Sequence, residues 1–149
     1  DRTGFDCGVP ALNEWLATKI SQFEKRDLAR TYVLVEDGQA SVKGYYAISN
    51  HTVVYEALPK DQAKGLPQID MPVVLIGQFA VDSKITGQGL GEFLLLDALR
   101  RAEYLSTRIG IQAVEVDAAR THQGDVGGRV APLEILAHRF DAEVRDALN

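Results

Sequence analysis

The junction from Gly87 to Gly91 constrains the fold more than any other part of this sequence. The run before it, 73–81, reads VVLIGQFAV and predicts a buried strand, and the residues after Gly89 place apolar side chains at helical spacing. Glycine lets the backbone approach a ligand where a Cβ would intervene. A strand, a glycine-rich turn and a helix present free backbone N–H groups at the positive end of a helix dipole. The junction therefore predicts a site for a phosphate-bearing cofactor or substrate.

The spacing of the glycines argues against two common phosphate-binding motifs. A P-loop needs Lys followed by Ser or Thr after its last glycine, and this chain has Leu90 in that place. The dinucleotide motif G-x-G-x-x-G is not matched by G-x-G-x-G, and its fold needs a tandem strand–helix series that the sequence does not show.

Length and composition predict one globular domain, 1–149, without a membrane span. The chain is 46% hydrophobic and 25% charged, and no apolar run approaches about 18 residues. Its net charge of −5 gives no bulk attraction for nucleic acid. The single Cys7 excludes an internal disulfide and agrees with a cytoplasmic protein.

Hydrophobic periodicity predicts alternating helices and strands. Asp6 is expected to cap a helix that has Pro10 in its first turn and ends near Lys25, with Trp15 on its apolar face. A loop with one helical turn is expected over 58–72, and Gly110 is the stop signal of the second helix. The predicted strands are 31–36, 42–49, 52–55, 73–81 and 113–117, and the second helix is 90–109. This order predicts a mixed α/β fold.

The glycine junction resembles motif A of the GNAT family of N-acetyltransferases, [Q/R]-x-x-G-x-[G/A]. Gly89 and Gly91 occupy its glycine positions, whereas Thr86 stands where the family usually has Gln or Arg. The resemblance implies a central mixed sheet that splays after its fourth strand, with flanking helices. It also implies acetyl-CoA as co-substrate, with no metal. The cofactor-binding residues that it implies are Phe79, Ala80, Val81, Thr86, Gly87, Gln88, Gly89, Leu90 and Gly91.

A closer resemblance starts near the first residue. The segment 5–16, FDCGVPALNEWL, is similar to the F-D-C-G-x-x-x-L-N-x-W-L opening of the acetyltransferase toxins of type II toxin–antitoxin pairs. The similarity runs over about residues 4–118. It implies acetylation of the α-amine of aminoacyl-tRNA, which blocks translation, and a ribbon-helix-helix antitoxin as partner; it leaves a homodimer open. Two alternatives also stay open: a small-molecule or protein amine as acceptor, and a catalytically impaired relative that binds the cofactor.

The sequence departs from this subfamily in two places. The subfamily has a first strand before the position of Asp1, so that strand is missing or cut from the numbering. After Ala118 it has a helix with a Y-x-x-x-G-F segment, whose tyrosine is the general acid for the CoA thiolate. Here 120–130 read RTHQGDVGGRV, 119–149 are atypical, and no tyrosine follows Tyr104. The catalytic residue is therefore unknown.

The chain offers few replacements for that tyrosine. His122 is the nearest candidate for the acid, although an exposed loop histidine is the simpler interpretation. Cys7 fits a small buried thiol better than a nucleophile, and Asp117 fits a helix cap as easily as a catalytic carboxylate. The oxyanion donor that the family implies is a backbone N–H near Ala80 or Val81.

The acceptor side is indicated by two patterns. Tyr45 and Tyr46 alternate across a strand, so we expect one to face the core and the other to face the substrate groove. Basic residues could contact tRNA phosphates, although such residues more often form a solvated face. The candidates are Lys19, Lys25, Arg26, Arg30, Lys84, Arg100 and Arg101.

Overall fold

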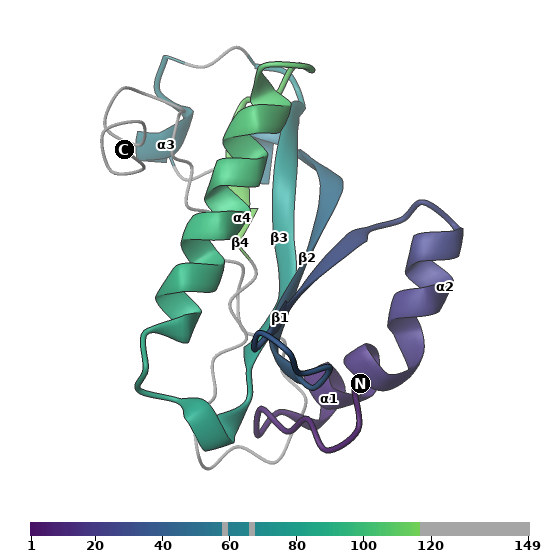
Figure 1. Cartoon of the computed structure of the whole chain (residues 1–149). Helices are drawn as coiled ribbons and strands as arrows, with labels where there is room; N and C mark the ends of the chain where they lie inside the picture. Colours follow the sequence, from purple (N-terminus) through teal and green to yellow (C-terminus); the bar gives the residue numbers. More distant parts are fainter. Residues whose placement is uncertain (58–59, 66–67, 117–149) are drawn as a thin grey trace.

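The computed structural model describes residues 1–57, 60–65 and 68–116, and it is built around a four-stranded sheet in the order β1-β2-β3-β4 (Figure 1). β2 pairs antiparallel with both β1 and β3, and β4 runs parallel to β3. The predicted mixed α/β sheet is therefore confirmed. Its strands are β1 (Arg30–Val35), β2 (Val42–Val53), β3 (Met71–Val81) and β4 (Ala113–Val116).

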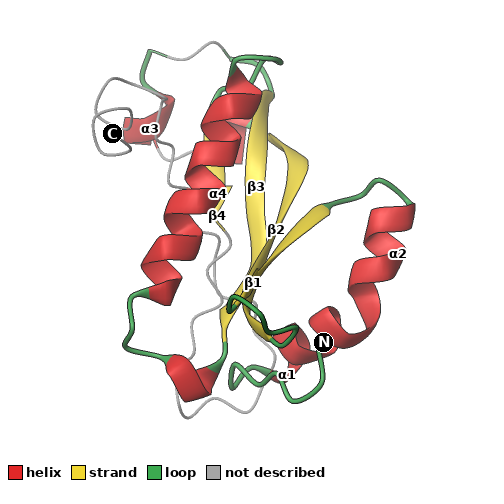
Figure 2. Cartoon of the chain, in the orientation of Figure 1, coloured by secondary structure: helices red, strands yellow, loops and turns green. Residues whose placement is uncertain are grey.

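Helices cover both faces of this sheet (Figure 2). On one face lies α4 (Leu90–Ser106), which buries Leu94, Ala98 and Ala102 against the sheet. On the other lies an N-terminal helical segment: α1 (Pro10–Glu14), the π-helical turn η1 (Trp15–Lys19) and α2 (Ile20–Lys25). No helix among the described residues has the length and apolar character needed to cross a bilayer.

The N-terminal helical segment ends where the sequence predicts, but it begins later. Its predicted apolar face is confirmed, because Trp15 and Leu16 are buried. The prediction that Asp6 caps the helix is wrong. The cap is Val9, which has no capping side chain, and Pro10 takes the first helical position, where its missing N–H costs no hydrogen bond.

The structure also tests other predicted boundaries. The separate strand predicted over 52–55 is wrong, because β2 continues to Val53 and a 3-10 turn, η2 (Tyr55–Ala57), follows. The single helical turn expected in the next loop is α3 (Lys60–Ala63). The predicted end of α4 is three residues too late, since Thr107 already donates its N–H to the carbonyl of Tyr104 in a tighter turn.

A β-bulge interrupts the pairing of β2 with β3. Tyr45 pairs with Ala80 and Ala47 pairs with Gly77, so Gln78 and Phe79 lie together opposite a single residue of β2. Gln78 has φ = 51°, in the left-handed region. The extra residue reverses the side-chain alternation along β3. As a result Ile76 faces α4, whereas Ala80 faces the N-terminal helices.

Gly44 allows α4 to lie close to the sheet. A Cβ at this position would lie 2.7 Å from Leu94 Cδ1 and 3.1 Å from the carbonyl oxygen of Ala80. We expect Gly44→Ala to lower the free energy of unfolding by about 1–3 kcal/mol, because the added methyl group overpacks this contact. Denaturant unfolding measures the change. Gly110→Ala is the control, since a Cβ there meets no atom within 4 Å; equal losses in both variants would contradict the packing argument.

Candidate active site

The C-terminal half of β3 has a free backbone edge. Val73–Ile76 pair with the four residues of β4, but β3 continues to Val81, and within 1–57, 60–65 and 68–116 no strand pairs with 77–81 on that side. Unpaired N–H and C=O groups on a strand edge can bind an extended ligand as an added strand. The predicted cofactor residues Phe79, Ala80 and Val81 lie on this edge.

The loop after β3 turns the chain into α4. Asp82, which is buried, accepts a hydrogen bond from the backbone N–H of Lys84 (2.9 Å) and caps the 3-10 turn η3 (Ser83–Ile85). Gly87 has φ = 83° and Gly89 has φ = 75°, a conformation that glycine adopts without strain. The segment from Thr86 to Gly89 is exposed, so its backbone is open to a ligand.

Gly89 is also the N-cap of α4, and it provides no capping side chain. The first N–H groups of a helix lack intrahelical acceptors and carry the positive end of the helix dipole, which favours an anion. The first turn of α4 lies against the end of β3, since a Cβ on Gly91 would lie 3.9 Å from Val81 Cγ2. The structure thus brings together the anion-binding loop and the free strand edge.

The two adjacent tyrosines of β2 do not face a groove. Tyr45 and Tyr46 point to opposite faces of the sheet, and both are fully buried. Tyr45 donates its hydroxyl to the carbonyl of Leu12 (2.6 Å), whereas Tyr46 donates to Asp97 and accepts from Arg101 Nε (2.9 Å). The prediction that one of them faces the substrate is wrong, because helices cover both faces.

Burial decides the protonation of the groups that could act as acids or nucleophiles. It raises the pKa of both tyrosine hydroxyls well above their ordinary value. It also raises the pKa of the half-buried Cys7 thiol, which lies 3.2 Å from Asn13 Oδ1. A protonated thiol is a poor nucleophile, so a packing role fits Cys7. His122 and Asp117 lie outside the described residues and stay predictions.

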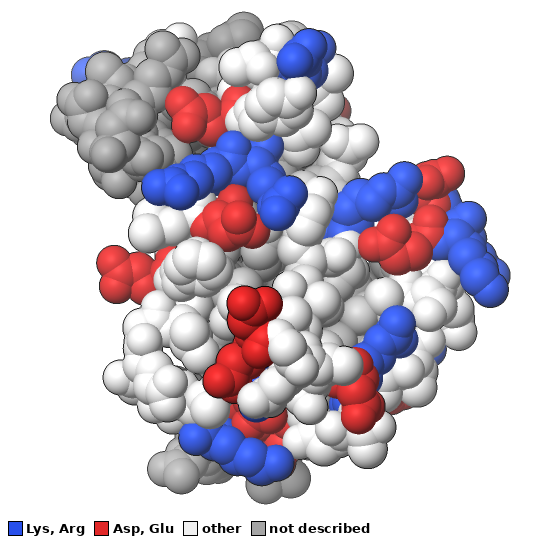
Figure 3. Space-filling view, viewed as in Figure 1, with Lys and Arg blue, Asp and Glu red and all other residues white. Residues whose placement is uncertain are grey.

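Several basic residues proposed as tRNA contacts already have protein partners. Arg30 pairs with Asp27 and Glu24, and Lys84 Nζ donates to the carbonyl of Gly4 (3.2 Å). Arg101 pairs with Asp97, and its guanidinium carbon lies 3.8 Å from the centre of the Tyr32 ring. Lys19, Lys25 and Arg26 are exposed on the N-terminal helical segment. Figure 3 shows basic groups over α4 and α2, each with acidic side chains beside it.

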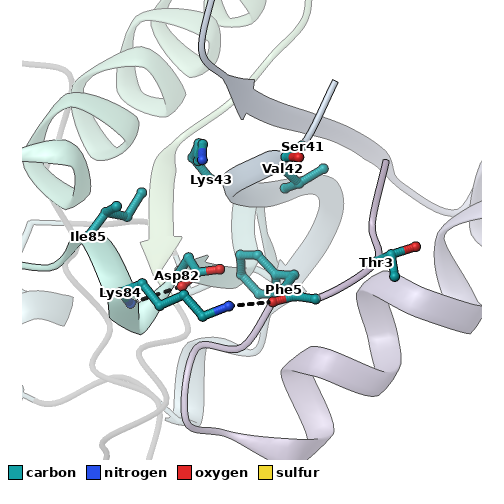
Figure 4. A pocket seen from close by; sticks show the side chains of 9 residues that line it. Thr3, Phe5, Ser41, Val42, Lys43, Asp82, Lys84 and Ile85 are labelled. Carbon is teal, nitrogen blue, oxygen red and sulfur yellow. Dashed lines mark hydrogen bonds between the residues drawn. The ribbon is translucent and has the colours of Figure 1, made fainter. Parts of the chain in front are cut away.

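A small pocket beside the loop was not predicted from the sequence. It has a volume of about 170 Å³ and lies between the N-terminal segment, the start of β2 and η3 (Figure 4). Phe5, Lys43 and Asp82 are among its lining residues. Asp82 and Ser83, directly after the strand, are the sequence signal for the turn η3 beside this pocket, since aspartate often caps helical turns. At the edge of the pocket, the hydrogen bond from Lys84 Nζ to the carbonyl of Gly4 joins the N-terminal segment to the loop.

One buried carboxylate lies where β3 and β4 separate. Glu115 of β4 is 2% exposed and pairs in register with Leu75. Its Oε2 atom has no hydrogen-bond partner, and His51 Nε2 lies 3.6 Å away. Sequence analysis did not select Glu115, although a carboxylate in an otherwise apolar strand is a signal that could have found it. Among the described residues, no three potential ligands are grouped so as to hold a metal ion.

Comparison with known proteins identifies similar sequences, although no protein-family model matches the chain. It is 33% identical over 118 residues to the tRNA-acetylating toxin of Mycobacterium tuberculosis (strain ATCC 25618 / H37Rv), covering 79% of this chain and 69% of that protein. It is 32% identical over 118 residues to the probable toxin TacT of Sinorhizobium fredii (strain NBRC 101917 / NGR234), covering 78% and 65%. The chain thus spans about two thirds of the length of these relatives.

Solved structures of similar toxins share the fold. A tyrosine mutant of KacT superposes with a TM-score of 0.74 at 35% identity, covering 81% of this chain and 72% of that one. AtaT complexed with acetyl-methionyl-tRNAfMet superposes with a TM-score of 0.72 at 31% identity, covering 81% of this chain and 72% of that one. A tyrosine-to-phenylalanine mutant of AtaT, bound to the C-terminus of the antitoxin AtaR and to acetyl-CoA, gives 0.65 at 29% identity, with coverage of 81% and 69%.

Proposed function

We propose a function for this chain from one premise: the chain belongs to the family of GNAT-type tRNA-acetylating toxins. We infer that it transfers an acetyl group from acetyl-CoA to the α-amine of an aminoacyl-tRNA. The relative named a tRNA-acetylating toxin and the AtaT complex with acetyl-methionyl-tRNAfMet support the acceptor. The AtaT complex with acetyl-CoA supports the donor.

One observation carries the proposal. The first turn of α4 lies against Val81, at the end of a strand whose backbone edge is free within the described part of the chain. A molecule with a phosphate group at one end and an extended amide arm fits these two features together, since the helix start attracts the anion and the strand edge pairs with the amides. Acetyl-CoA has both parts, and its acetyl group would then lie along β3.

The chain's own groups divide the work of the reaction. The backbone amides around Gly89 would hold the pyrophosphate, and the edge from Phe79 to Val81 would align the amide arm. A backbone N–H near Ala80 or Val81 would donate to the thioester carbonyl oxygen, where negative charge develops. Acetyl-CoA would supply the acyl thioester that the amine attacks. Holding both substrates in this geometry provides much of the rate, and the amine must arrive uncharged.

The decisive experiment is acetyl transfer at high enzyme concentration. The chain is mixed with radiolabelled acetyl-CoA and a pool of charged tRNA, and the label is followed into the aminoacyl-tRNA. We expect label on the α-amine and none on uncharged tRNA, because the ester-linked amino group is the acceptor. Label on protein lysines or on a small amine instead would move the acceptor to another class, and no binding of acetyl-CoA would remove the proposal.

We also propose an antitoxin partner with a ribbon-helix-helix domain, encoded beside this protein and acting with it in the cytoplasm. The AtaT structure with the C-terminus of AtaR supports an antitoxin partner, and the ribbon-helix-helix domain is what the resemblance implies. Co-expression of the two neighbouring genes should give a complex that survives size exclusion. Separate elution, or the absence of a neighbouring gene of this class, would count against it.

A further inference from the structure

We propose that Asp6, Asn13 and Ser83 are positioning residues that hold the cofactor loop in place for acetyl-CoA. The inference rests on the proposed function. It gives a role to the F-D-C-G opening, to which the family resemblance assigned none. We call these three residues the loop brace. None of them lies within the glycine segment itself, so they act through the backbone that leads into it.

The first half of the loop brace is a turn closed onto α1. The Asp6 carboxylate accepts hydrogen bonds from the backbone N–H of Gly8 (2.8 Å) and from Asn13 Nδ2 (2.8 Å). Asn13 Oδ1 accepts from the backbone N–H of Cys7 (3.0 Å) and lies 3.2 Å from its Sγ atom. The side-chain amide of Asn13 thus donates through its nitrogen and accepts through its oxygen at the same time. The bonds to Gly8 and Asn13 lower the pKa of Asp6, which keeps its carboxylate ionised.

The second half joins that turn to the loop. The carbonyl oxygen of Asp6 accepts from both the backbone N–H and the hydroxyl of Ser83, each at 2.8 Å. These contacts join residues 77 positions apart in the sequence. Ser83 begins η3, the turn between β3 and the glycine segment, and Thr86 Oγ1 donates back to the Ser83 carbonyl (3.3 Å). Ser83 is therefore fixed on both sides.

Anchoring at α1 gives the loop brace a rigid base. Leu12 and Leu16, on either side of Asn13, are buried in the core beneath the sheet. The loop itself is exposed and contains two glycines in left-handed conformations, so it has little stiffness of its own. A ligand binds more weakly when the backbone donors that hold it must become ordered on binding, because the entropy cost of ordering them reduces the binding free energy. Fixing Ser83 removes part of this cost before the ligand arrives.

The test measures binding of CoA to the full chain by calorimetry. Ser83→Ala removes the hydroxyl bond to Asp6 and leaves the backbone bond, so we expect CoA to bind about three- to tenfold more weakly. Asn13→Ala should weaken binding similarly. Ser83→Thr keeps the hydroxyl and should bind like the wild type. Thr18→Ala is the matched control, because it removes an equally exposed hydroxyl bond, to the Glu14 carbonyl (2.9 Å), away from the loop.

Hydrogen exchange on the unliganded chain distinguishes a local change in the loop from a general loss of stability. In Ser83→Ala the amides of 84–91 should exchange faster, while those of the sheet stay unchanged; in Thr18→Ala neither should change. Equal CoA affinity in the wild type and in Ser83→Ala would overturn the inference, even if Asn13→Ala fails to fold. A wild type that does not bind CoA would instead remove the proposed function, and the loop brace with it.

Discussion

Gly89→Asp is expected to weaken the binding of CoA by at least about a hundredfold. The φ of 75° at Gly89 lies in the left-handed region, which Asp and Asn adopt more readily than other residues with a Cβ, so the added charge is the main effect of this substitution. A carboxylate at the N-cap of α4 would also lie where the pyrophosphate is proposed to bind, and juxtaposed like charges cost several kcal/mol. This repulsion exceeds the ~2.7 kcal/mol that corresponds to a hundredfold change. Calorimetry with CoA measures the loss.

Two variants separate the causes. Gly38→Asp makes the same change at a glycine with nearly the same conformation (φ = 76°), in the turn between β1 and β2 and away from the loop. Its CoA affinity should equal that of the wild type. Gly89→Asn keeps the size and the tolerance of the left-handed conformation but removes the charge, so it should bind CoA better than Gly89→Asp. Unchanged affinity in Gly89→Asp would refute the placement of the anion site.

The parts of the site that sequence predicted are those encoded by neighbouring residues. The strand 73–81, the glycine turn and the start of α4 follow one another along the chain, and each has its own pattern of apolar and glycine residues. Their order alone brings the strand end and the helix start together. The prediction of a loop at the end of a buried strand therefore needed no knowledge of which strands pair.

The parts that sequence could not predict depend on distant pairing. The bulge at Gln78 is visible only when β2 and β3 are aligned, because it changes the register between them. The burial of both Tyr45 and Tyr46 follows from helices on both faces of the sheet. Asp6 was predicted as a helix cap from its neighbours alone. Its contact with Ser83, which is far away in the sequence, could not be predicted in that way.

None of the tyrosines in the core of the chain can replace the general acid that the resemblance implies. Tyr45 and Tyr46 are fully buried, with hydroxyls bonded to Leu12 and Asp97. Burial raises their pKa, so each is a weaker acid than an ordinary tyrosine. Tyr32 lies beneath the guanidinium of Arg101. The hydroxyls of Tyr45 and Tyr46 therefore stabilise the packed core and do not reach the strand edge for proton transfer.

The two remaining tyrosines lie far from that edge. Tyr104 is 14 residues beyond Leu90 on α4, which is about 21 Å along the helix axis. Its hydroxyl accepts a hydrogen bond from Arg108 (3.0 Å). Tyr55 follows Val53, which pairs with Met71 at the start of β3, whereas the proposed site is at the other end of that strand. The five tyrosines of the sequence are thereby accounted for.

We therefore expect this chain to acetylate charged tRNA about 100- to 10,000-fold more slowly than a relative that keeps the Y-x-x-x-G-F segment, since general acid catalysis typically contributes that factor. Binding of acetyl-CoA should stay comparable in the two proteins, because it depends on the loop and the strand edge. Single-turnover transfer at saturating acetyl-CoA separates rate from affinity. Comparable rates would contradict the prediction and show that another group protonates the thiolate. His122→Ala would then identify or remove the nearest candidate in the sequence, according to whether the rate falls or holds.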